Sequence, residues 1–418
     1  MDATDRSEFP APMLKILTFS TLFPNPVAPH HGIFTETTLR QQLRSFPMQV
    51  QVVAPVPWFP SRAPLFGRYA GYAGVPHEEV RAGVRVLHPR YLSLPRVGMH
   101  VAPLTLARAA RPVVAGLLAA GHDFDLIDAH YFYPDGVAAA LLGRAFGKPV
   151  TITALGSDIN LLARYRGPRR MMRWAAGRSA AMISVCQALR GEMVRLGMPG
   201  DRIHALRNGV DLELFYPEPR AMARATLGVD GFTLLSVGHL VENKGHDKAI
   251  RAMAALPDAR LLVAGCGPER ARLEALARQL GVAARVRFGG VLRQERLRTW
   301  YSAADALVLA SSREGWANVL LEAMACGTPA LASDVGGTAE VITCPAAGLL
   351  LPENSAAGIV SAVQALRAAP PARGATRAHA ARHAWHDTAR ARFDLFARIA
   401  GRPTKPAEPC TLQTNCLT

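Results

Sequence analysis

Two glutamates with seven residues between them are the most specific chemical signal in the chain. Glu314 opens the segment EGWANVLLEAMACGTPALASD, after an apolar run that predicts a buried strand, and Glu322 falls in the expected next helix. The first amides of that helix, near Asn318, Val319 and Leu320, are suited to a diphosphate, since a helix N-terminus carries partial positive charge. Carboxylates accept hydrogen bonds from paired hydroxyls, as on a ribose or a hexose. The segment therefore predicts a site for a nucleotide that carries a sugar.

A lysine turn is expected on the same rim of the second half. The segment SVGHLVENKGHDKAI reads as a strand, a glycine turn, and then Lys244 and Gly245 leading into a helix. An ammonium group there would bind the diphosphate and stabilise it as a leaving group, although a solvated turn lysine is the alternative. The segment VAGCGPER is similar to a dinucleotide loop, but Pro268 and a missing third glycine argue against that function. We expect a tight turn beside the nucleotide instead.

The first half offers further candidates at the expected ends of strands. Gly32 lies between the first strand and the first helix, where backbone without a Cβ can approach a ligand closely. His130 ends the strand LIDAH and is expected to face the cleft, unless the backbone satisfies its ring. Asp158 is either a cleft residue or a helix cap. Asp123 and Asp125 have the Asp-x-Asp spacing of metal-binding transferases, but they precede a strand at its amino end, so we expect no metal there.

Short apolar runs alternate with amphipathic stretches from Leu14 onward, which is typical of parallel α/β units. The first half supplies five strands, from LKILTFST to AAMISV, with helices expected at 35–45, 102–119, 136–147 and 186–196, an insertion at 55–76 and a hairpin around VRVLHP. The second half restarts the pattern at FTLLSVG. We therefore predict two Rossmann-like domains, residues 13–207 and 208–370, with a boundary near 207–220, where Asn-Gly and two prolines interrupt the periodicity. One final helix is expected within 371–400, and disorder at 1–12 and 401–418.

Composition excludes several classes of protein. With 418 residues, half of them hydrophobic, the chain has apolar side chains for two cores. Its richest apolar stretch, residues 101–120, is interrupted by Arg108 and Arg111, so we expect a soluble, cytoplasmic chain. The first twelve residues lack the pattern of a secretion signal. The six cysteines form no CxxC pair, which argues against a disulfide framework or a zinc site.

The formal net charge of +16 comes almost entirely from arginine. Six arginines between Arg164 and Arg178 surround Met171, Met172 and Trp174. Three interpretations remain open for this stretch: docking on anionic lipid, an ordinary solvated face, or nucleic-acid binding. Only 7% of the residues are aromatic and no recognition motif appears, so nucleic acid is not the expected partner.

The glutamate pair, the Lys244 turn, the RNGVD segment and SDVGG at 333–337 together resemble family 4 of the retaining glycosyltransferases. The resemblance spans most of residues 13–400. It implies a GT-B fold, in which two Rossmann-like domains face each other across a cleft and a C-terminal helix crosses back to the first. The segments FPNPVAPHHGIF, HYFYP and GSDINLL are further similar to the branch that builds cell-envelope polysaccharides such as teichuronic acid or exopolysaccharide.

The resemblance also implies roles for individual residues. Lys244 would hold the donor diphosphate, Glu322 the ribose hydroxyls and Glu314 the transferred sugar, while His130 would lie against that sugar. The catalytic candidates are thus His130, Glu314 and Lys244. The donor-binding candidates are Gly32, His239, Lys244, Glu314, Gly315, Trp316, Ala317, Asn318, Val319, Leu320 and Glu322. His239 stands where the family usually has an arginine, which implies either weaker or more pH-dependent donor binding or another arginine in its place.

The expected activity is retaining transfer of a hexose from a nucleoside diphosphate sugar to a glycan or lipid-linked acceptor. The resemblance implies no metal and no cofactor besides the nucleotide sugar, and it favours attack on the face that the leaving phosphate vacates. A nucleotide-sugar epimerase of the same fold is one alternative, and it would turn over the donor without an acceptor. A basic nucleic-acid-binding protein is the other. The sequence predicts neither the base, the sugar, the acceptor nor the linkage.

Overall fold

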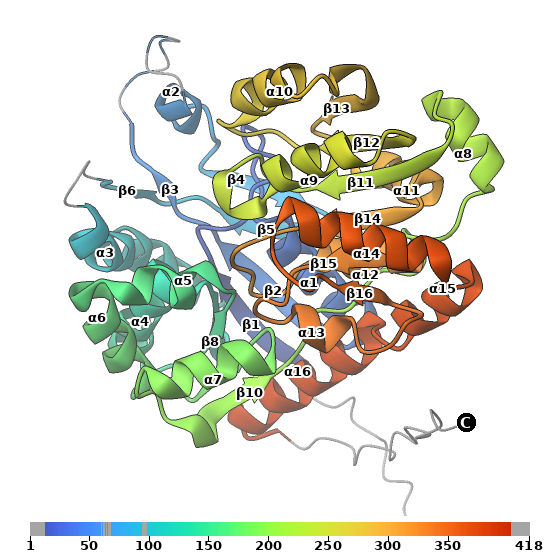
Figure 1. The fold of residues 1–418 in the computed structure, drawn as a ribbon. Coiled ribbons are helices and arrows are strands. Elements are labelled where there is room, and N and C mark those ends of the chain that lie inside the picture. The colour runs from blue at the N-terminus through green and yellow to red at the C-terminus, as the bar shows by residue number, and fades with distance from the viewer. Residues whose placement is uncertain are drawn as a thin grey trace, which may run out of the picture.

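The computed structural model describes residues 13–59, 61, 63, 65, 68–93 and 98–402. Two sheets, each from one half of the chain, are covered by helices and lie side by side (Figure 1). The segments expected to be disordered, 1–12 and 401–418, lie outside the described residues except for Gly401 and Arg402.

The first sheet has eight strands in the order β10-β9-β8-β7-β1-β2-β5-β4. The strands of the first half are β1 (Leu14–Phe19), β2 (Met48–Val53), β3 (Val56–Pro57), β4 (Glu78–Arg81), β5 (Val84–Leu87), β6 (Arg90–Tyr91), β7 (Leu126–His130), β8 (Val150–Ala154), β9 (Ala181–Ser184) and β10 (Ile203–Ala205). Of these ten, β3 and β6 pair with each other in a separate two-stranded parallel sheet. Neighbours pair in parallel except β4 and β5, which form the predicted hairpin. Because β5 also pairs in parallel with β2, the hairpin extends the sheet.

The second sheet has six parallel strands in the order β13-β12-β11-β14-β15-β16. They are β11 (Phe232–Val237), β12 (Ala259–Ala264), β13 (Val286–Gly290), β14 (Ala306–Leu309), β15 (Ala330–Ala332) and β16 (Gly348–Leu350). Both faces of the central strands are buried, which explains their continuous apolar sequences. The prediction of two Rossmann-like domains is confirmed, and the expected boundary falls in the connection between β10 and β11.

Helices connect these strands and cover both sheets. In the first half they are α1 (Ile33–Ser45), α2 (Arg68–Tyr72), α3 (Gly98–Ala119), α4 (Val137–Phe146), α5 (Ser157–Asn160), α6 (Arg166–Ala176) and α7 (Gln187–Arg195). In the second half they are α8 (Arg220–Leu227), α9 (His246–Ala252), α10 (Arg270–Gln279), α11 (Gln294–Ala303), α12 (Asn318–Ala325), α13 (Thr338–Val341), α14 (Ala356–Ala368), α15 (Arg373–Ala381) and α16 (Trp385–Ile399). The four helices predicted for the first half are all present as α1, α3, α4 and α7.

Helix α3 differs from the sequence-based expectation. Arg108 and Arg111 predict that this stretch does not span a membrane, yet the helix is long and apolar enough, by length and composition alone, to cross one. One side of it, with Leu106, Val114 and Leu117, packs into the core of the first domain. A core helix of this kind passes the same test of length and composition.

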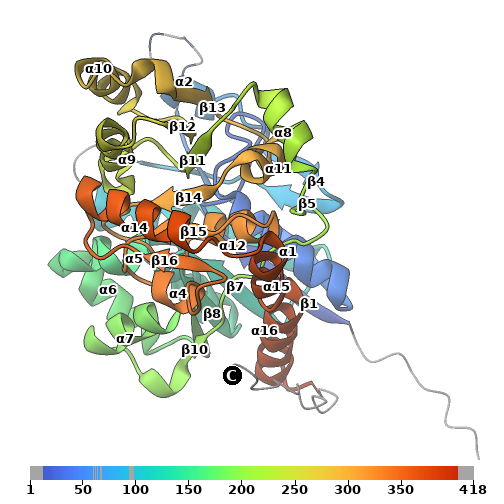
Figure 2. The same cartoon turned by 45° about the vertical axis from the view of Figure 1, so that its right-hand side comes forward.

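The expectation of one final helix is wrong, because residues 373–399 form two. Helix α15 packs against α12 of the second domain, whereas α16 runs beside α1 of the first (Figure 2). The chain is extended between them because the His383 carbonyl accepts a hydrogen bond from Val210 N–H (2.9 Å) and Ala384 forms a parallel bridge with Val210. The expected return of the chain to the first domain is therefore made by α16 alone.

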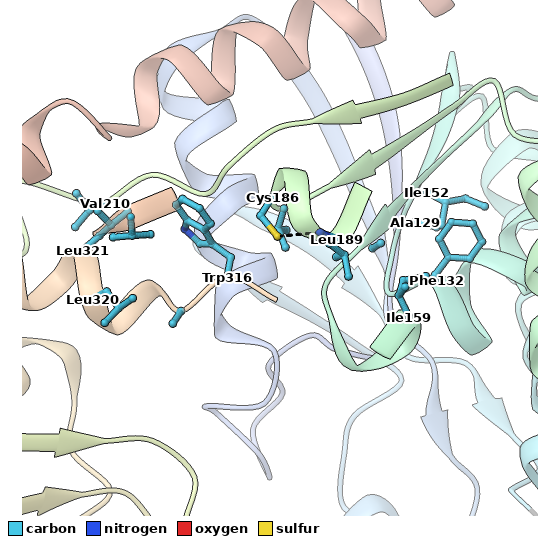
Figure 3. Close-up of a cluster of buried hydrophobic side chains, with 14 of the residues drawn as sticks. Ala129, Phe132, Ile152, Ile159, Cys186, Leu189, Val210, Trp316, Leu320 and Leu321 are labelled. Atoms are coloured by element: carbon cyan, nitrogen blue, oxygen red, sulfur yellow. Dashed lines mark hydrogen bonds between the residues drawn. The ribbon is translucent and has the colours of Figure 1, made fainter. Parts of the chain in front are cut away.

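One apolar cluster joins the two domains. It includes core residues of both sheets, such as Ile152 of β8 and Leu309 of β14. Figure 3 shows Trp316, from the loop after β14, between Val210 and Leu321 on one side and Cys186 of the first domain on the other. The two domains thus pack directly on each other at the level of this loop.

Candidate active site

Lys244 and Glu314 meet at the carboxyl-end edge of the second sheet. Lys244 follows β11 and Glu314 follows β14, and these strands are neighbours, so their loops lie together. Lys244 Nζ donates to Glu314 Oε1 at 2.6 Å, and Ser311 Oγ donates to the same oxygen at 2.7 Å. The side chains of Lys244 and Glu314 are 26% and 9% exposed. The structure therefore places the two residues expected to hold the diphosphate and the sugar in direct contact.

Glycines allow the turns around Lys244 to pack closely. A Cβ at Gly265 would lie 1.8 Å from the Gly238 carbonyl oxygen, so the VAGCGPER turn lies directly against the SVGHL turn. Gly245 has a φ of +68°, and a Cβ there would lie 2.1 Å from the Ala310 carbonyl oxygen. A side chain at Gly245 would separate the loops that carry Lys244 and Glu314, and one at Gly265 would separate the loop after β12 from the loop that carries Lys244.

The loop after Glu314 is held from three sides. A Cβ at Gly315 would lie 2.1 Å from the Leu155 carbonyl oxygen of the first domain, and the Gly315 carbonyl accepts from Gly337 N–H (3.0 Å) and Cys186 Sγ (3.3 Å). The Glu314 carbonyl accepts from Asn160 Nδ2 at 3.2 Å. Contacts from the first domain therefore fix the backbone of the candidate donor loop.

The start of α12 only partly matches the expected diphosphate-binding amides. The helix begins at Asn318, and Asn318 and Val319 lie in its first turn. The expectation of a free amide at Leu320 is wrong, because its N–H donates to the Ala317 carbonyl at 3.0 Å, as in a tight first turn. Asn208, from the RNGVD segment, donates through Nδ2 to Asn318 Oδ1 at 3.3 Å, which ties the connection between the domains to this helix end.

Glu322 lies one turn into α12 and accepts a hydrogen bond from Tyr301 Oη of α11 at 2.8 Å. Burial raises the pKa of Glu322 to about 7, and the Tyr301 hydrogen bond only partly offsets this effect. The side chain lines a small cavity together with Asn318 and Phe34 of α1. No hydrogen bond between described residues joins Glu322 to Lys244.

His130 is held inside the first domain. Its side chain is 4% exposed, and Nε2 lies 3.0 Å from Asp128 Oδ2. Asp128 also accepts from Thr151 Oγ1 at 2.7 Å and lies 3.5 Å from Arg392 Nη1 of α16. Burial opposes ionisation of Asp128, but His130 and Arg392 hold the pKa of Asp128 below its ordinary value. No described contact joins His130 to Glu314 or Lys244.

Gly32 and His239 each lie in the connection between a strand and the next helix, as the sequence predicts. Gly32 is the N-cap of α1 with a φ of +69°, and a Cβ there would lie 2.2 Å from the Leu22 backbone. Its close approach is thus to the loop after β1. His239 is exposed in the turn after β11, before Lys244.

Sequence reasoning missed two polar groups that border the site. Ser311 holds Glu314, as described above, and His246 starts α9 behind the Gly238 turn. His246 Nδ1 lies 2.8 Å from Ser236 Oγ, and its Nε2 is buried with no partner among the described residues. Burial lowers the pKa of His246 to about 4, so its ring is neutral at pH 7. The GHDKAI segment contains this histidine, but only the fold shows that its ring turns back under Gly238.

The three other aspartates singled out in the sequence accept hydrogen bonds from backbone amides or form ion pairs. The Asp158 carboxylate accepts from the amides of Phe132 (2.7 Å) and Gly156 (2.7 Å), so it organises the loops after β7 and β8. Asp123 pairs with Lys148 at 2.6 Å, and Asp125 with Arg402 at 2.6 Å. Among the residues that the structure describes, no group of three His, Cys, Asp or Glu side chains is placed to hold a metal ion.

Two family models match the chain, one for each domain. Residues 36–214 match Glycosyltransferase Family 4, and residues 219–383 match Glycosyl transferases group 1. The chain is 33% identical over 303 residues to D-inositol 3-phosphate glycosyltransferase 1 of Catenulispora acidiphila, covering 67% of this chain and 72% of the relative. It is 28% identical over 339 residues to the putative teichuronic acid biosynthesis glycosyltransferase TuaC of Bacillus subtilis, covering 78% and 83%.

A solved structure supports the same fold. HepE of Anabaena, in complex with UDP and glucose, superposes with a TM-score of 0.68 at 19% identity, covering 91% of this chain and 98% of HepE. At 19% identity, the similarity to HepE shows a shared fold and no more. Because the family models and the relatives cover both domains, the chain belongs to the family 4 glycosyltransferases, which have the GT-B fold.

Proposed function

We propose that this protein is a retaining hexosyltransferase that takes its sugar from a nucleoside diphosphate sugar. The acceptor in this proposal is a glycan or a lipid-linked sugar used in cell-surface polysaccharide synthesis. The observation that carries the proposal is the contact between Lys244 and Glu314, made where two parallel strands of the second domain end against loops of the first. Ligands of such sheets bind at the carboxyl ends of the strands.

The chemistry of the proposed transfer rests on charge at the leaving diphosphate. Lys244 would exchange its bond to Glu314 for one to the diphosphate, and the first amides of α12 would donate to the same oxygens. Glu314, released from Lys244 and still held by Ser311, would accept hydrogen bonds from hydroxyl groups of the sugar. In this proposal these groups neutralise the leaving group without a metal or a cofactor.

The role of His130 in the proposal follows from its place at the end of β7. Its ring is oriented by Asp128, and both residues lie on the same face of the strand. In this proposal the other ring nitrogen, Nδ1, would form a hydrogen bond with a sugar in the cleft. His130 is therefore our candidate for binding the sugar from the first domain, and Asp128 positions its ring.

The class of acceptor is suggested by the names of relatives. One relative is named for D-inositol 3-phosphate and another for teichuronic acid biosynthesis, a cell-envelope polymer. HepE was solved with UDP and glucose, which favours a uridine nucleotide and a hexose as the first ligands to test. The identities of base, sugar and acceptor in this chain are part of the proposal.

We also propose that the enzyme works in the cytoplasm, on the inner face of the cell membrane. Helix α6 presents exposed Arg166 and Arg170, Tyr165 beside it is 48% exposed, and Leu104 of the adjacent α3 is 57% exposed. Arg178 stacks over Trp174 at 4.6 Å. Arginines interspersed with exposed apolar side chains suit an anionic lipid surface.

The experiment that tests the proposed function is a thermal-shift series with UDP, GDP and ADP, and with a single-stranded oligonucleotide at matched ionic strength. A ligand at 100 times its dissociation constant stabilises the folded protein by about 2.7 kcal/mol. We expect one nucleoside diphosphate to shift the midpoint and Lys244→Ala to remove that shift. Lys148→Ala is the matched control, because it also breaks an ion pair but lies at the amino end of its strand.

Each outcome of this series has a definite meaning. If none of the three diphosphates shifts the midpoint while the oligonucleotide gives a salt-sensitive shift, the transferase proposal is overturned and the basic surface becomes the candidate function. If a nucleotide sugar is converted to its epimer with no acceptor present, the epimerase alternative is correct. Release of nucleoside diphosphate that depends on an added acceptor supports the transferase.

A further inference from the structure

A second cavity opens beside the proposed donor site and has a different lining. It encloses about 500 Å³ between α5, α6 and α7 of the first domain and the loops after β14 and β15 of the second. Its lining residues are Ile159, Asn160, Ala163, Arg164, Arg169, Ala188, Leu189, Glu192, Arg195, Leu196, Ser312, Arg313, Glu314, Val335 and Gly336. The volume is within the range of small-molecule sites in proteins.

The charges on this lining are unbalanced. Four arginines and two glutamates contribute to it. Both glutamates are already paired, Glu192 with Arg195 and Glu314 with Lys244. Within the described part of the chain, no carboxylate lies within ion-pair distance of Arg164, Arg169 or Arg313. A cavity with several unpaired guanidinium groups concentrates positive potential and favours an anionic ligand.

The floor of the cavity is apolar. Ile159, Ala163 and Leu189 line it and are themselves buried at 4%, 2% and 2% exposure. Asn160 supplies an amide that donates to the Glu314 carbonyl at 3.2 Å. An apolar floor with arginines around it suits a ligand that combines a ring or chain with an anionic group.

The cavity meets the donor site at one residue. Of the residues assigned to the donor or to catalysis, only Glu314 lines it, and Lys244, His130 and Glu322 do not. Glu314 is the residue assigned to the transferred sugar, so a ligand in this cavity would lie against the sugar and away from the diphosphate. This is the position that an acceptor requires.

We propose that this cavity binds the acceptor and selects it by a phosphate or diphosphate group, which Arg164, Arg169 and Arg313 bind. The inference rests on the proposed transferase function and names the acceptor class of that site. Guanidinium groups bind phosphate oxygens through paired N–H donors, so three of them give geometric as well as electrostatic selection. The neighbouring exposed arginines of α6 would draw the same anions toward the cavity.

The test uses inorganic pyrophosphate as the probe, with the nucleoside diphosphate identified by thermal shift present at saturation to occupy the donor site. Binding is measured by isothermal titration calorimetry. We expect Arg169→Ala and Arg313→Ala each to weaken pyrophosphate binding about tenfold or more, since a charge-assisted hydrogen bond contributes on that scale. Arg170→Ala is the matched control, because Arg170 is the next residue of the same helix and does not line the cavity.

Two results would overturn the proposal. One is no pyrophosphate binding in the wild type with the donor site filled. The other is equal affinity in Arg169→Ala, Arg313→Ala and Arg170→Ala. If the two cavity variants instead lose affinity for the nucleoside diphosphate itself, the arginines belong to the donor site and the proposal is also wrong.

The source of the phosphate is distinguished by displacement. Glucose 1-phosphate represents a soluble phosphorylated acceptor, and vesicles of phosphatidylglycerol represent a lipid headgroup, with phosphatidylcholine vesicles as the neutral control. The ligand that displaces pyrophosphate from the wild type identifies the source, and its own binding should weaken in Arg169→Ala. Failure of both to displace it contradicts an acceptor role for the cavity.

Failure of this proposal is separable from failure of the proposed function. The first stage, binding of a nucleoside diphosphate and its loss in Lys244→Ala, does not involve the cavity. If that stage fails, the transferase proposal fails, and pyrophosphate binding is then measured on Lys244→Ala without nucleotide. If it succeeds and the cavity variants behave like the control, only the acceptor proposal is wrong.

Discussion

At the scale of single residues, the donor loop depends on glycines that leave no room for a side chain. Gly336 has a φ of +56°, and a Cβ there would lie 2.2 Å from the Glu314 carbonyl oxygen. The SDVGG segment was part of the family resemblance, and the structure supplies its physical reason. A glycine at this position lets the loop after β15 support the loop that carries Glu314.

Gly336→Ala tests this support. We expect it to lower the free energy of unfolding by about 3 kcal/mol, because it combines left-handed strain with a backbone clash. Gly83→Ala is the control: Gly83 has a φ of +79° but nothing within 4 Å of its Cβ position, so the cost should be about 1 kcal/mol. Urea unfolding of the two variants measures the difference. Equal losses in the free energy of unfolding would show that the contact with Glu314 does not contribute to stability.

The ionisation of Glu322 gives a second prediction at this scale. Burial raises its pKa to about 7 from an ordinary 4.5, so the folded chain binds this proton more tightly than the unfolded chain. The contribution of Glu322 to the free energy of unfolding therefore falls as pH rises from about 4.5 to about 7. Asp135, whose pKa burial also raises to about 7, acts in the same direction.

Glu322→Gln isolates the effect of this one carboxyl group. Between pH 5 and pH 8 we expect the variant to lose about 2 kcal/mol less stability than the wild type, a value reduced for partial exposure. Denaturant unfolding at both pH values, with the same buffer salt, measures the two losses. Parallel losses in the wild type and the variant would contradict a proton held by Glu322 in this range.

At the scale of elements, α16 returns the chain to the first domain and packs there. Arg392 is 1% exposed, lies 3.5 Å from Asp128 and donates to Thr153 Oγ1 at 3.2 Å. Phe393 stacks on Phe46 at the end of α1 with ring centroids 4.8 Å apart. The helix therefore contributes a buried charge as well as an apolar face to a domain that is distant in sequence.

Arg392→Ala should cost about 3 kcal/mol or more in the free energy of unfolding, because it leaves Asp128 with less compensation in the core. Arg398→Ala, on the exposed side of the same helix, should change it by less than about 0.5 kcal/mol. Urea titration of both variants, followed by circular dichroism, provides the measurement. A small loss in Arg392→Ala would mean that the apolar contacts alone hold α16 in place.

The elements also show what the sequence could and could not predict. Most strands of the two sheets and helices α1, α3, α4 and α7 were predictable because buried parallel strands and amphipathic helices have different periodicities, whereas β10, β16 and α6 were not predicted. The break between α15 and α16 was not, because it arises from a hydrogen bond to Val210, more than 150 residues earlier. The contact of Lys244 with Glu314 followed from strand order, whereas the cavity lined by Arg169 and Arg313 depends on two domains and has no local signal.

At the scale of the whole molecule, the net charge of +16 includes arginines in ion pairs and, in the part of the chain that the structure describes, exposed arginines without a carboxylate partner. Several arginines of the second domain form ion pairs, such as Arg224 with Asp305 and Arg298 with Glu218. Arg166 and Arg170 of α6 remain exposed with no carboxylate in ion-pair range among the described residues. In our proposal these two arginines of the first domain attract the protein to an anionic membrane.

Binding to vesicles of phosphatidylglycerol should fall steeply with salt, because screening shortens the range of these charges from about 10 Å at 0.1 M to about 3 Å at 1 M. Arg166→Glu with Arg170→Glu should weaken binding by about 1 kcal/mol or more per residue. Arg251→Glu with Arg278→Glu changes the net charge equally on the second domain and serves as control. Vesicle flotation measures all three proteins, and equal weakening by both pairs would contradict docking through α6.

The chain passes between its domains twice, and the two passages touch. Val210 N–H bonds to the His383 carbonyl, and a Cβ at Gly209 would lie 2.6 Å from the Trp385 backbone. Because both covalent connections lie at one place, a rotation of one domain relative to the other about this place would stretch neither connection. A rotation about this axis would part Gly156 from Gly315, where a Cβ at Gly156 would lie only 2.8 Å from Gly315 Cα, and would therefore open the proposed donor site.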